Sequence, residues 1–276
     1  MRAVGYRPSA KVADTGRMWT KSIWDNIPWD QIEAGEREGS VFFDDFKNFP
    51  DMAEADAKDT IWATFMTASG TIKQGVDSEH GEVEMTLAAA DNDEGYMATG
   101  GDTGGMFKFI KQATGVPHLI ALEVRLKVST LLGSAFVGFA EEGLVAADGL
   151  FSDTGVFTNK DYVGFSVVEA TPTKLDFGHN KENGTDVKVV TGIHTLVADT
   201  YVKVGVLYDY RHSNAQQVKV FKDGVINAAF TTKTQIDDAT NFPAGEEMVL
   251  FMGVKNVTDI KVFTVDWVRA AMVVLA

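Results

Sequence analysis

The chain has 276 residues, of which 45% are hydrophobic, so it is long enough to bury a sizeable core and too apolar for extended disorder. Its net charge is −14 and its pI is about 4.7, so its electrostatic field repels nucleic acid and anionic membrane surfaces. The absence of cysteine excludes disulfides, thiolate nucleophiles and cysteine-bound metals. We therefore expect a globular domain held by packing or by assembly, with neither nucleic acid nor a membrane as its partner.

Residues 1–39 differ from the rest of the chain and are expected to form an N-terminal arm. They carry six basic and six acidic residues, so the net negative charge lies entirely on residues 40–276. No apolar run is long enough to predict a cleaved signal or a membrane span. Within the arm, Pro28 suits the first position of a short helix, which Trp29 and Ile32 would dock.

The arm also holds the candidate protein-interface residues, which are Trp19, Trp24, Trp29 and Ile32. Large aromatic side chains are efficient anchors at protein interfaces because they bury much area at a low entropy cost. The alternative is that the arm packs on its own domain. The sequence leaves both uses open.

From residue 40 onward, short apolar or alternating runs are separated by Gly, Asn, Asp and Pro, which predicts an all-β domain over residues 40–276. Val124 and Leu126 alternate with Glu123, Arg125 and Lys127, as expected for a sheet with one solvated face. The segments are too many and too short for parallel βαβ units, so a two-sheet jelly-roll sandwich is predicted. The expected strands are 41–46, 61–68, 81–88, 106–109, 119–127, 134–140, 162–169, 174–179, 186–190, 201–209, 217–221, 228–232, 247–254 and 260–268.

Residues 201–229 carry the clearest local signal of this fold. Residues 201–209 and 217–221 predict neighbouring strands, and the second strand is followed by Asp223-Gly224. Glycine adopts a positive φ at low cost and aspartate bonds the local backbone, so this dipeptide predicts a tight turn into the next strand.

Three segments together resemble the laminin-G and concanavalin A-like β-sandwich group: Phe42–Phe46, Tyr201–Ala229 and Val265–Arg269. In laminarinase-like members, segments similar to the first and the third form the first and last strands, which lie together. The same segments, in this order and over this length, are also similar to a set of tailed-phage virion proteins. The resemblance implies a concanavalin A-like jelly-roll sandwich with an extended N-terminal arm, in a phage virion.

Laminarinase-like relatives also place three acidic residues on one strand, so that two carboxylates meet at a single glycosidic bond. The nearest match is Glu82-Val83-Glu84-Met85-Thr86, in which Glu82 and Glu84 share a face but Thr86 takes the third acidic position. A solvated strand face accounts for the same alternation. We therefore expect that the protein is not an enzyme.

Asp91, Asp93 and Glu94 are the candidate metal ligands, since they offer carboxylate oxygens to calcium, which many members of this sandwich group bind. Tyr96 stands where an EF-hand loop requires glycine, so the segment is not an EF-hand. A plain acidic loop is the alternative, and no other cofactor is indicated.

The expected function is that of a capsid decoration (cement) protein on the outer surface of a tailed-phage virion. Its partners would be the major capsid protein and copies of itself, with a homotrimer matching threefold sites. The alternative is a glycan-binding tail-fibre or receptor-binding module, with Trp62, Tyr96 and Tyr162 as candidate sugar-stacking residues. A glycoside hydrolase acting through Glu82 and Glu84 is a weaker third hypothesis.

Overall fold

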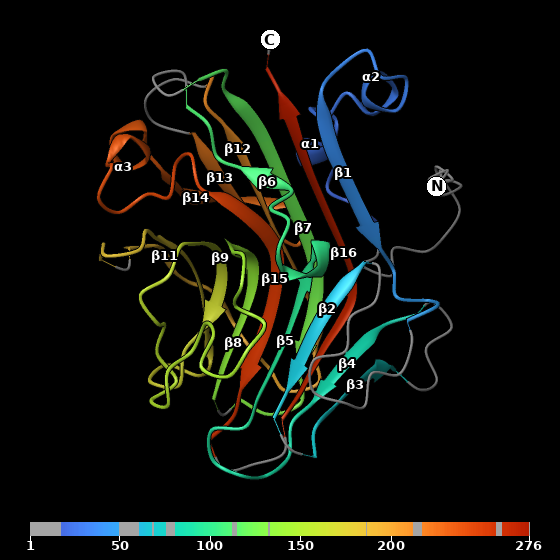
Figure 1. The fold of residues 1–276 in the computed structure, drawn as a ribbon, viewed down its shortest axis with the longest axis vertical. Coiled ribbons are helices and arrows are strands. Elements are labelled where there is room, and N and C mark those ends of the chain that lie inside the picture. Colours follow the sequence, from blue (N-terminus) through green and yellow to red (C-terminus); the bar gives the residue numbers. More distant parts are fainter. Residues whose placement is uncertain are drawn as a thin grey trace.

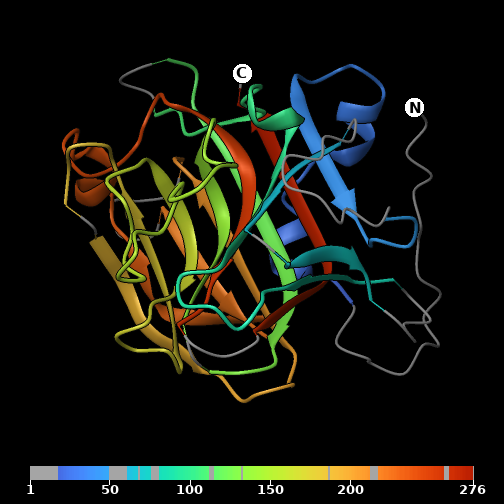
Figure 2. The same cartoon turned by 60° about the horizontal axis from the view of Figure 1, so that its bottom comes forward.

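The fold was analysed in a computed structural model. The structure describes residues 18–49, 61–67, 69–75, 81–111, 115–131, 133–185, 187–211, 217–257 and 261–275. Two antiparallel sheets, here called sheet A and sheet B, pack face to face and make up almost all of it (Figures 1 and 2). The predicted all-β sandwich is therefore confirmed.

Sheet A has the strand order β14-β13-β12-β7-β16-β4-β3, and β1 pairs with the remaining edge of β16. Its strands are β1 (Gly39–Asp44), β3 (Thr71–Gln74), β4 (Val83–Thr86), β7 (His118–Val128), β12 (Val202–Asp209), β13 (Val218–Lys222), β14 (Val225–Thr231) and β16 (Val262–Val274). The long strand β16 pairs with β7 along one side, and with β4 and then β1 along the other.

Sheet B has the order β11-β10-β9-β8-β15-β5-β2, and β6 pairs with β15. Its strands are β2 (Trp62–Met66), β5 (Glu94–Thr99), β6 (Phe107–Lys108), β8 (Ser134–Glu141), β9 (Tyr162–Val167), β10 (Lys174–Asn180), β11 (Val187–Thr195) and β15 (Glu247–Lys255). The short helices are α1 (Lys21–Trp24), α2 (Trp29–Glu33), η1 (Gly100–Asp102) and α3 (Lys233–Asp237). None of the described helices has the length and apolar character needed to cross a membrane.

The main core lies between the two sheets. Val124 and Leu126 of β7 enter it from sheet A, and Leu250 and Met252 of β15 enter it from sheet B. All four side chains are at most 3% exposed, so alternate residues of both sheets are removed from water. The alternation expected on β7 is therefore present, although its other face is not solvated throughout: Glu123 is 1% exposed because the arm covers it.

Two expectations about strand neighbours are confirmed. The first and the last strand of the domain lie together, since β1 pairs with β16 and Phe43 stands opposite Arg269. The turn between β13 and β14 is formed at Asp223-Gly224, where φ is 48° and 82°. Two successive positive φ values match the right-handed twist of the flanking strands, which is why this dipeptide joins them so tightly.

Four features of the described structure differ from the expected segments. Residues 94–99 form β5 where only an acidic turn was expected, and residues 71–74 form β3. Strand β16 continues to Val274, beyond the predicted strand end at residue 268. In the arm, the short helix after Pro28 is present as α2, but a second helix, α1, precedes it, so residues 18–38 are folded and not extended.

Candidate functional site

The arm docks on the outer face of sheet A through one buried carboxylate, Glu123 of β7. The backbone N–H of Thr20 donates to both carboxylate oxygens, at 3.0 and 2.9 Å, and the indole Nε1 of Trp24 donates to Oε2 at 2.7 Å. The Thr20 hydroxyl also donates to Glu123. Lys203 of β12 lies 3.7 Å from the same carboxylate and donates to the carbonyl of Met18. Hydrogen bonds to an ionised acceptor are the strong ones, so Glu123 fixes the start of α1 on the sheet.

Arg269 of β16 stands directly opposite Glu123 in the sheet, and its guanidinium contacts aromatic rings of the arm and of β1. Its guanidinium carbon lies 4.0 Å from the ring centroid of Trp19, 5.0 Å from Trp29 and 5.1 Å from both Trp24 and Phe43. We call these four rings the aromatic cage. Burial lowers the pKa of Arg269 to about 10, against the opposing charge of Glu123, so the side chain remains a cation at neutral pH.

A second apolar cluster lies beneath the arm, outside the main core. Ile23, Trp24 and Ile27 pack there on Leu207 and Phe221 of sheet A, and all five are at most 4% exposed. Trp29 and Ile32 are half-buried against the same cluster. Residues 18–38 therefore pack on their own domain, which is one of the two uses that the sequence left open.

Part of the arm nevertheless faces solvent. Met18 is 49% exposed, Trp19 is 37% exposed and Phe43 of β1 is 51% exposed, and the last two share the guanidinium of Arg269. We call these three residues the arm patch. Of the four predicted interface residues, Trp19 is thus the most available to a partner, whereas Trp24 is reachable only if the arm undocks. The patch also contains Met18 and Phe43, which sequence reasoning missed.

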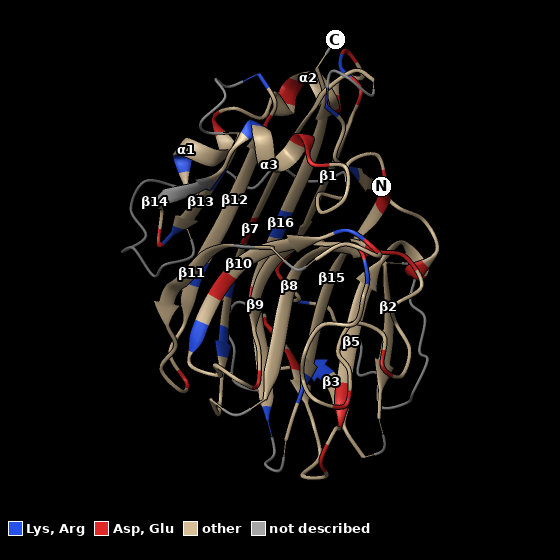
Figure 3. Cartoon of the chain, turned by 90° about the vertical axis from the view of Figure 1, so that its left-hand side faces the viewer, with Lys and Arg blue, Asp and Glu red and all other residues tan. Residues whose placement is uncertain are grey.

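Both signs of charge occur along β7 and β16 in this region (Figure 3). The strands place Glu123, Arg125 and Arg269 close together on the outer face, and Arg125 also pairs with Asp266. Alternation in the sequence predicted which residues share a face. It did not indicate that an aromatic arm would cover them, because that contact joins residues about 100 to 250 positions apart.

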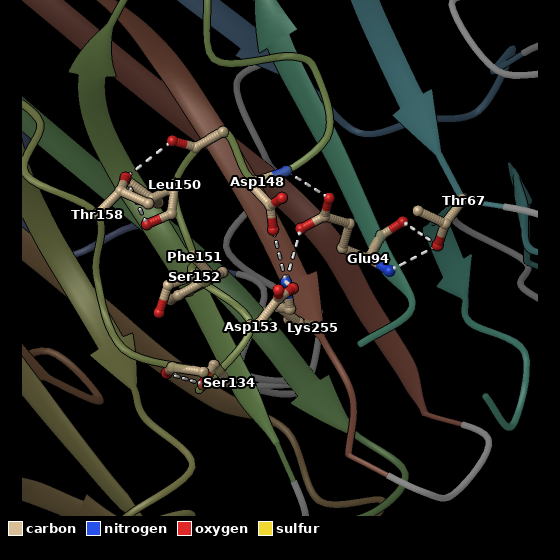
Figure 4. A network of polar contacts seen from close by, with 12 residues as sticks. Thr67, Glu94, Ser134, Asp148, Leu150, Phe151, Ser152, Asp153, Thr158 and Lys255 are labelled. Carbon is tan, nitrogen blue, oxygen red and sulfur yellow. Dashed lines mark hydrogen bonds and ion pairs between the residues drawn. The ribbon is translucent and has the colours of Figure 1, made fainter. Parts of the chain in front are cut away.

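A different polar network lies on the outer face of sheet B, at the end of β15 (Figure 4). The ammonium of Lys255 is 3.3 Å from Glu94 Oε2, 3.1 Å from Asp148 Oδ1 and 3.5 Å from Asp153 Oδ1. Tyr96 donates to Glu94 Oε2 at 2.7 Å, and the N–H of Asp148 donates to Oε1 at 2.6 Å. Burial alone lowers the pKa of Lys255, but the charges of Glu94 and Asp148 outweigh it and raise that pKa. The network holds residues 148–153 against the sheet.

This network decides how the predicted metal ligands are used. Glu94 is the first residue of β5. Its carboxylate forms an ion pair with Lys255 and accepts hydrogen bonds from the hydroxyl of Tyr96 and the backbone N–H of Asp148. Asp91 is exposed in the preceding turn, and Asp93 is 8% exposed. Within the described residues, no group of three or more acidic or histidine side chains is arranged to hold a metal ion. The three carboxylates are therefore not brought together, since a lysine ammonium supplies the positive charge beside Glu94.

The aromatic residues proposed for sugar stacking are buried. Trp62, Tyr96 and Tyr162 are each at most 1% exposed, so the expectation that they present their rings to a ligand is wrong. Trp62 belongs to the core between the sheets. Tyr96 and Tyr162 lie in an aromatic layer that residues 144–157 cover on the outer face of sheet B, together with Phe136, Phe151, Phe157 and Phe251.

Glu82 and Glu84, the candidate catalytic pair, both have structural neighbours. Glu82 is 8% exposed and accepts a hydrogen bond from the hydroxyl of Tyr201, whose ring lies 3.8 Å below the guanidinium of Arg125. Glu84 of β4 stands between Lys73 of β3 and Thr264 of β16. A buried carboxylate fixed by a tyrosine and a cross-strand carboxylate beside a lysine are ordinary ways to satisfy charge on a sheet.

The chain matches no family model and no curated protein. Among solved structures, it is similar to peanut lectin, with a TM-score of 0.55 and 13% identity over 87% of this chain and 99% of the lectin. It is also similar to a Lotus tetragonolobus seed lectin, with a TM-score of 0.55 and 10% identity over 86% and 100% of the two chains. A protein of unknown function from Shewanella oneidensis MR-1 matches with a TM-score of 0.51 and 13% identity over 90% and 95%. At such identities the likeness shows the fold alone, which is a concanavalin A-like jelly-roll sandwich, as predicted.

Proposed function

We propose that this protein is a non-enzymatic structural protein of a tailed-phage virion, and that it decorates the outer surface of the capsid. The observation that carries the proposal is the arm patch: two aromatic side chains and a methionine stay exposed, and the two aromatic rings flank the partly buried guanidinium of Arg269. Exposed aromatic side chains beside an arginine are typical of the residues that dominate protein interfaces. The phage context comes from the resemblance of residues 42–46, 201–229 and 265–269 to virion proteins.

The absence of an enzymatic role is part of the same proposal, and the use of the carboxylates supports it. Glu82 is occupied by Tyr201, and Glu94 is occupied by Lys255. A glycoside hydrolase needs two carboxyl groups that flank one glycosidic bond. Retained glycosidase activity in a variant carrying both Glu82→Gln and Glu84→Gln would end the hypothesis that these two residues are catalytic.

The proposed partners are the major capsid protein and further copies of this chain. The arm patch would contact a capsid subunit, while the strongly acidic remainder of the domain stays in solvent. Closed symmetric oligomers are the rule for such proteins, and a homotrimer would match threefold positions on a capsid. The proposed location is therefore the outer surface of the virion.

The test compares a patch variant with a matched surface variant. Met18→Ser, Trp19→Ser and Phe43→Ser together remove the arm patch, whereas Val197→Ser changes one apolar residue that is 55% exposed elsewhere. We expect the patch variant to lose binding to capsids stripped of this protein by at least about 100-fold, because central aromatic anchors each contribute about 1–2 kcal/mol or more. The Val197 variant should bind as the wild type does.

Two outcomes would contradict the proposal. One is full occupancy of capsids by a folded patch variant. The other is a virion that contains only a few copies of the chain, because decoration requires hundreds and a fibre component does not.

The second candidate function is glycan binding, and the fold is what favours it, since the similar structures include peanut lectin and a Lotus tetragonolobus seed lectin. The aromatic layer of sheet B is covered, and the exposed carboxylates of Asp148 and Asp153, whose side chains are 60% and 76% exposed, are the candidate sugar contacts on that face. A broad glycan array separates the two functions. Selective binding that Asp153→Asn abolishes would favour the glycan-binding module.

A further inference from the structure

We propose that Arg269 and the aromatic cage form a receptor for a carboxylate group that a protein partner carries. The inference rests on the proposed assembly function and names the chemistry of its contact. The proposed ligand is the carboxylate of an aspartate or a glutamate of the partner, which enters the arm patch between Trp19 and Phe43.

Among the described residues, no carboxylate lies within ion-pair distance of Arg269, although Glu123 stands opposite it and acts on it through its charge. A guanidinium has five N–H donors in one plane. None of them donates to a described residue, and the buried Nε has no acceptor. Its cross-strand neighbour Glu123 is engaged by Thr20, Trp24 and Lys203, and makes no ion pair with Arg269. The four rings contact the guanidinium but accept none of the in-plane hydrogen bonds.

The surface around Arg269 suits a carboxylate that arrives on a protein. The side chain of Arg269 is itself partly exposed, and the exposed Trp19 and Phe43 flank it. Apolar groups around a charge pair exclude water and strengthen it. Among the described strands, β1 pairs with β16 along one edge, and the proposal places an extended partner segment along the other edge. An acidic residue next to an apolar one, on an extended segment, fits all three features.

The competing explanation is that Arg269 only pins the arm to the sheet. Cation–π contacts with the cage would then be its whole role, and a bound carboxylate would bring no advantage over a neutral group of the same shape. The two explanations differ in one measurable property. If Arg269 is a carboxylate receptor, the site binds an acid more tightly than its amide. If Arg269 only holds the arm on the sheet, the two bind equally.

The experiment uses the full chain and two small probes, 3-phenylpropanoate and 3-phenylpropanamide, which differ only in the charge of the polar group. Binding is followed by NMR through the indole N–H signals of Trp19, Trp24 and Trp29, assigned with single Trp→Phe variants. We expect the acid to shift the Trp19 signal with a Kd on the order of 1 mM, as a fragment of this size can reach, and the amide to bind at least about 10-fold more weakly.

Variants of the cation test the assignment. Arg269→Gln should abolish the preference for the acid, and Arg269→Lys should retain only part of it, because an ammonium cannot form the bidentate pair. Lys222→Gln removes an exposed cation that is paired with Asp223, and it should change nothing. If Arg269→Gln undocks the arm, the comparison of acid with amide in the wild type still decides the matter.

Three results would overturn the inference. The first is equal binding of acid and amide, and the second is no saturable shift with either probe. The third is a shift with inorganic phosphate but not with the acid, which would make the site a phosphate site. Loss of capsid binding in the patch variant together with equal binding of the two probes would retain the assembly function and reject the carboxylate. Discrimination of the probes by a protein that does not bind capsids would do the reverse.

Discussion

The docking of the arm depends on the charge of Glu123, so Glu123→Gln is the most informative single substitution. Thr20 and Trp24 present three donor groups to its two oxygens. A glutamine keeps the shape but offers one oxygen, and its amide faces at least one of these donors. Charge-assisted bonds are about 1 kcal/mol stronger than neutral ones, and a buried donor without an acceptor costs about 1–3 kcal/mol. We expect the free energy of docking to fall by about 2–4 kcal/mol.

Limited proteolysis of residues 18–38 measures this docking, and urea unfolding measures the stability of the whole domain. The undocked fraction should rise by about 30- to 1,000-fold, so cleavage should accelerate before the domain unfolds. Asp25→Asn is the control, because its ion pair with Lys21 joins side chains that are 57% and 83% exposed and should be worth at most about 0.5 kcal/mol. Equal cleavage rates in the Glu123 variant and the wild type would refute the assigned role of Glu123.

Three further predictions concern the rest of the domain. Lys255→Met leaves Glu94 buried without its cation, so the free energy of unfolding in urea should fall by about 3–5 kcal/mol. Adding Glu94→Gln should restore part of that loss. Equal stability of the single and the double variant would count against the ion pair of Lys255 with Glu94. Burial lowers the pKa of Lys261 to about 7, so between about pH 7 and 10 the unfolded chain binds a proton that the folded chain does not. The free energy of unfolding should therefore rise with pH by up to about 1.4 kcal/mol per pH unit in this range. Lys261→Met should lose this rise, and parallel pH profiles of the variant and the wild type would disprove the role of Lys261. Gly164→Ala places a Cβ atom 2.6 Å from the ring of Phe136 and 2.7 Å from the carbonyl oxygen of Val137. In a thermal melt, this variant should be destabilised by about 1–3 kcal/mol. The control Gly104→Ala places its Cβ no closer than 3.6 Å to any atom beyond its chain neighbours and should melt as the wild type does.

The structure also changes what a deletion of the arm would report. Removing residues 1–39 would uncover Leu207 and Phe221, which the arm now keeps at 2% and 3% exposure. Such a protein would expose an apolar patch on sheet A and would be prone to aggregation. Loss of capsid binding after the deletion would then have two causes, and substitutions in the arm patch avoid this ambiguity.

Local signals in the sequence were enough to predict the type of fold. Alternation on β7 and the turn at Asp223-Gly224 both appear in the structure. The pairing of the first with the last strand also appears, but it was implied by the resemblance to laminarinase-like proteins and not by a local signal. Strand β5 was missed because Asp91–Gly95 has the composition of a turn, and the pairing with β15 on one side and β2 on the other makes residues 94–99 a strand. Helix α3 did carry a signal that was overlooked, since Thr232 and Gln235 form a capping box at its start.

The candidate site was predictable only in part, because its contacts are long-range. The tryptophans indicated that the arm anchors on a protein surface, yet nothing near them in the sequence pointed to Glu123 or Arg269. Likewise, the acidic run at Asp91 suggested a metal, while the cation that Glu94 meets lies 161 residues later, at Lys255. Charge pairing across a sheet depends on register, which one sequence fixes only through the complete fold.

The central position of β16 has a consequence for the order in which the protein is made. This strand lies between β7 on one side and β4 and β1 on the other, and it contains residues 262–274. During synthesis, β1 therefore lacks its described partner β16 until about 230 later residues have left the ribosome, because Phe43 pairs with Arg269. Such distant pairing slows folding and exposes unpaired strand edges meanwhile. We expect sheet A to close only after translation of the domain, and nascent chains that stop short of β16 to depend on chaperones.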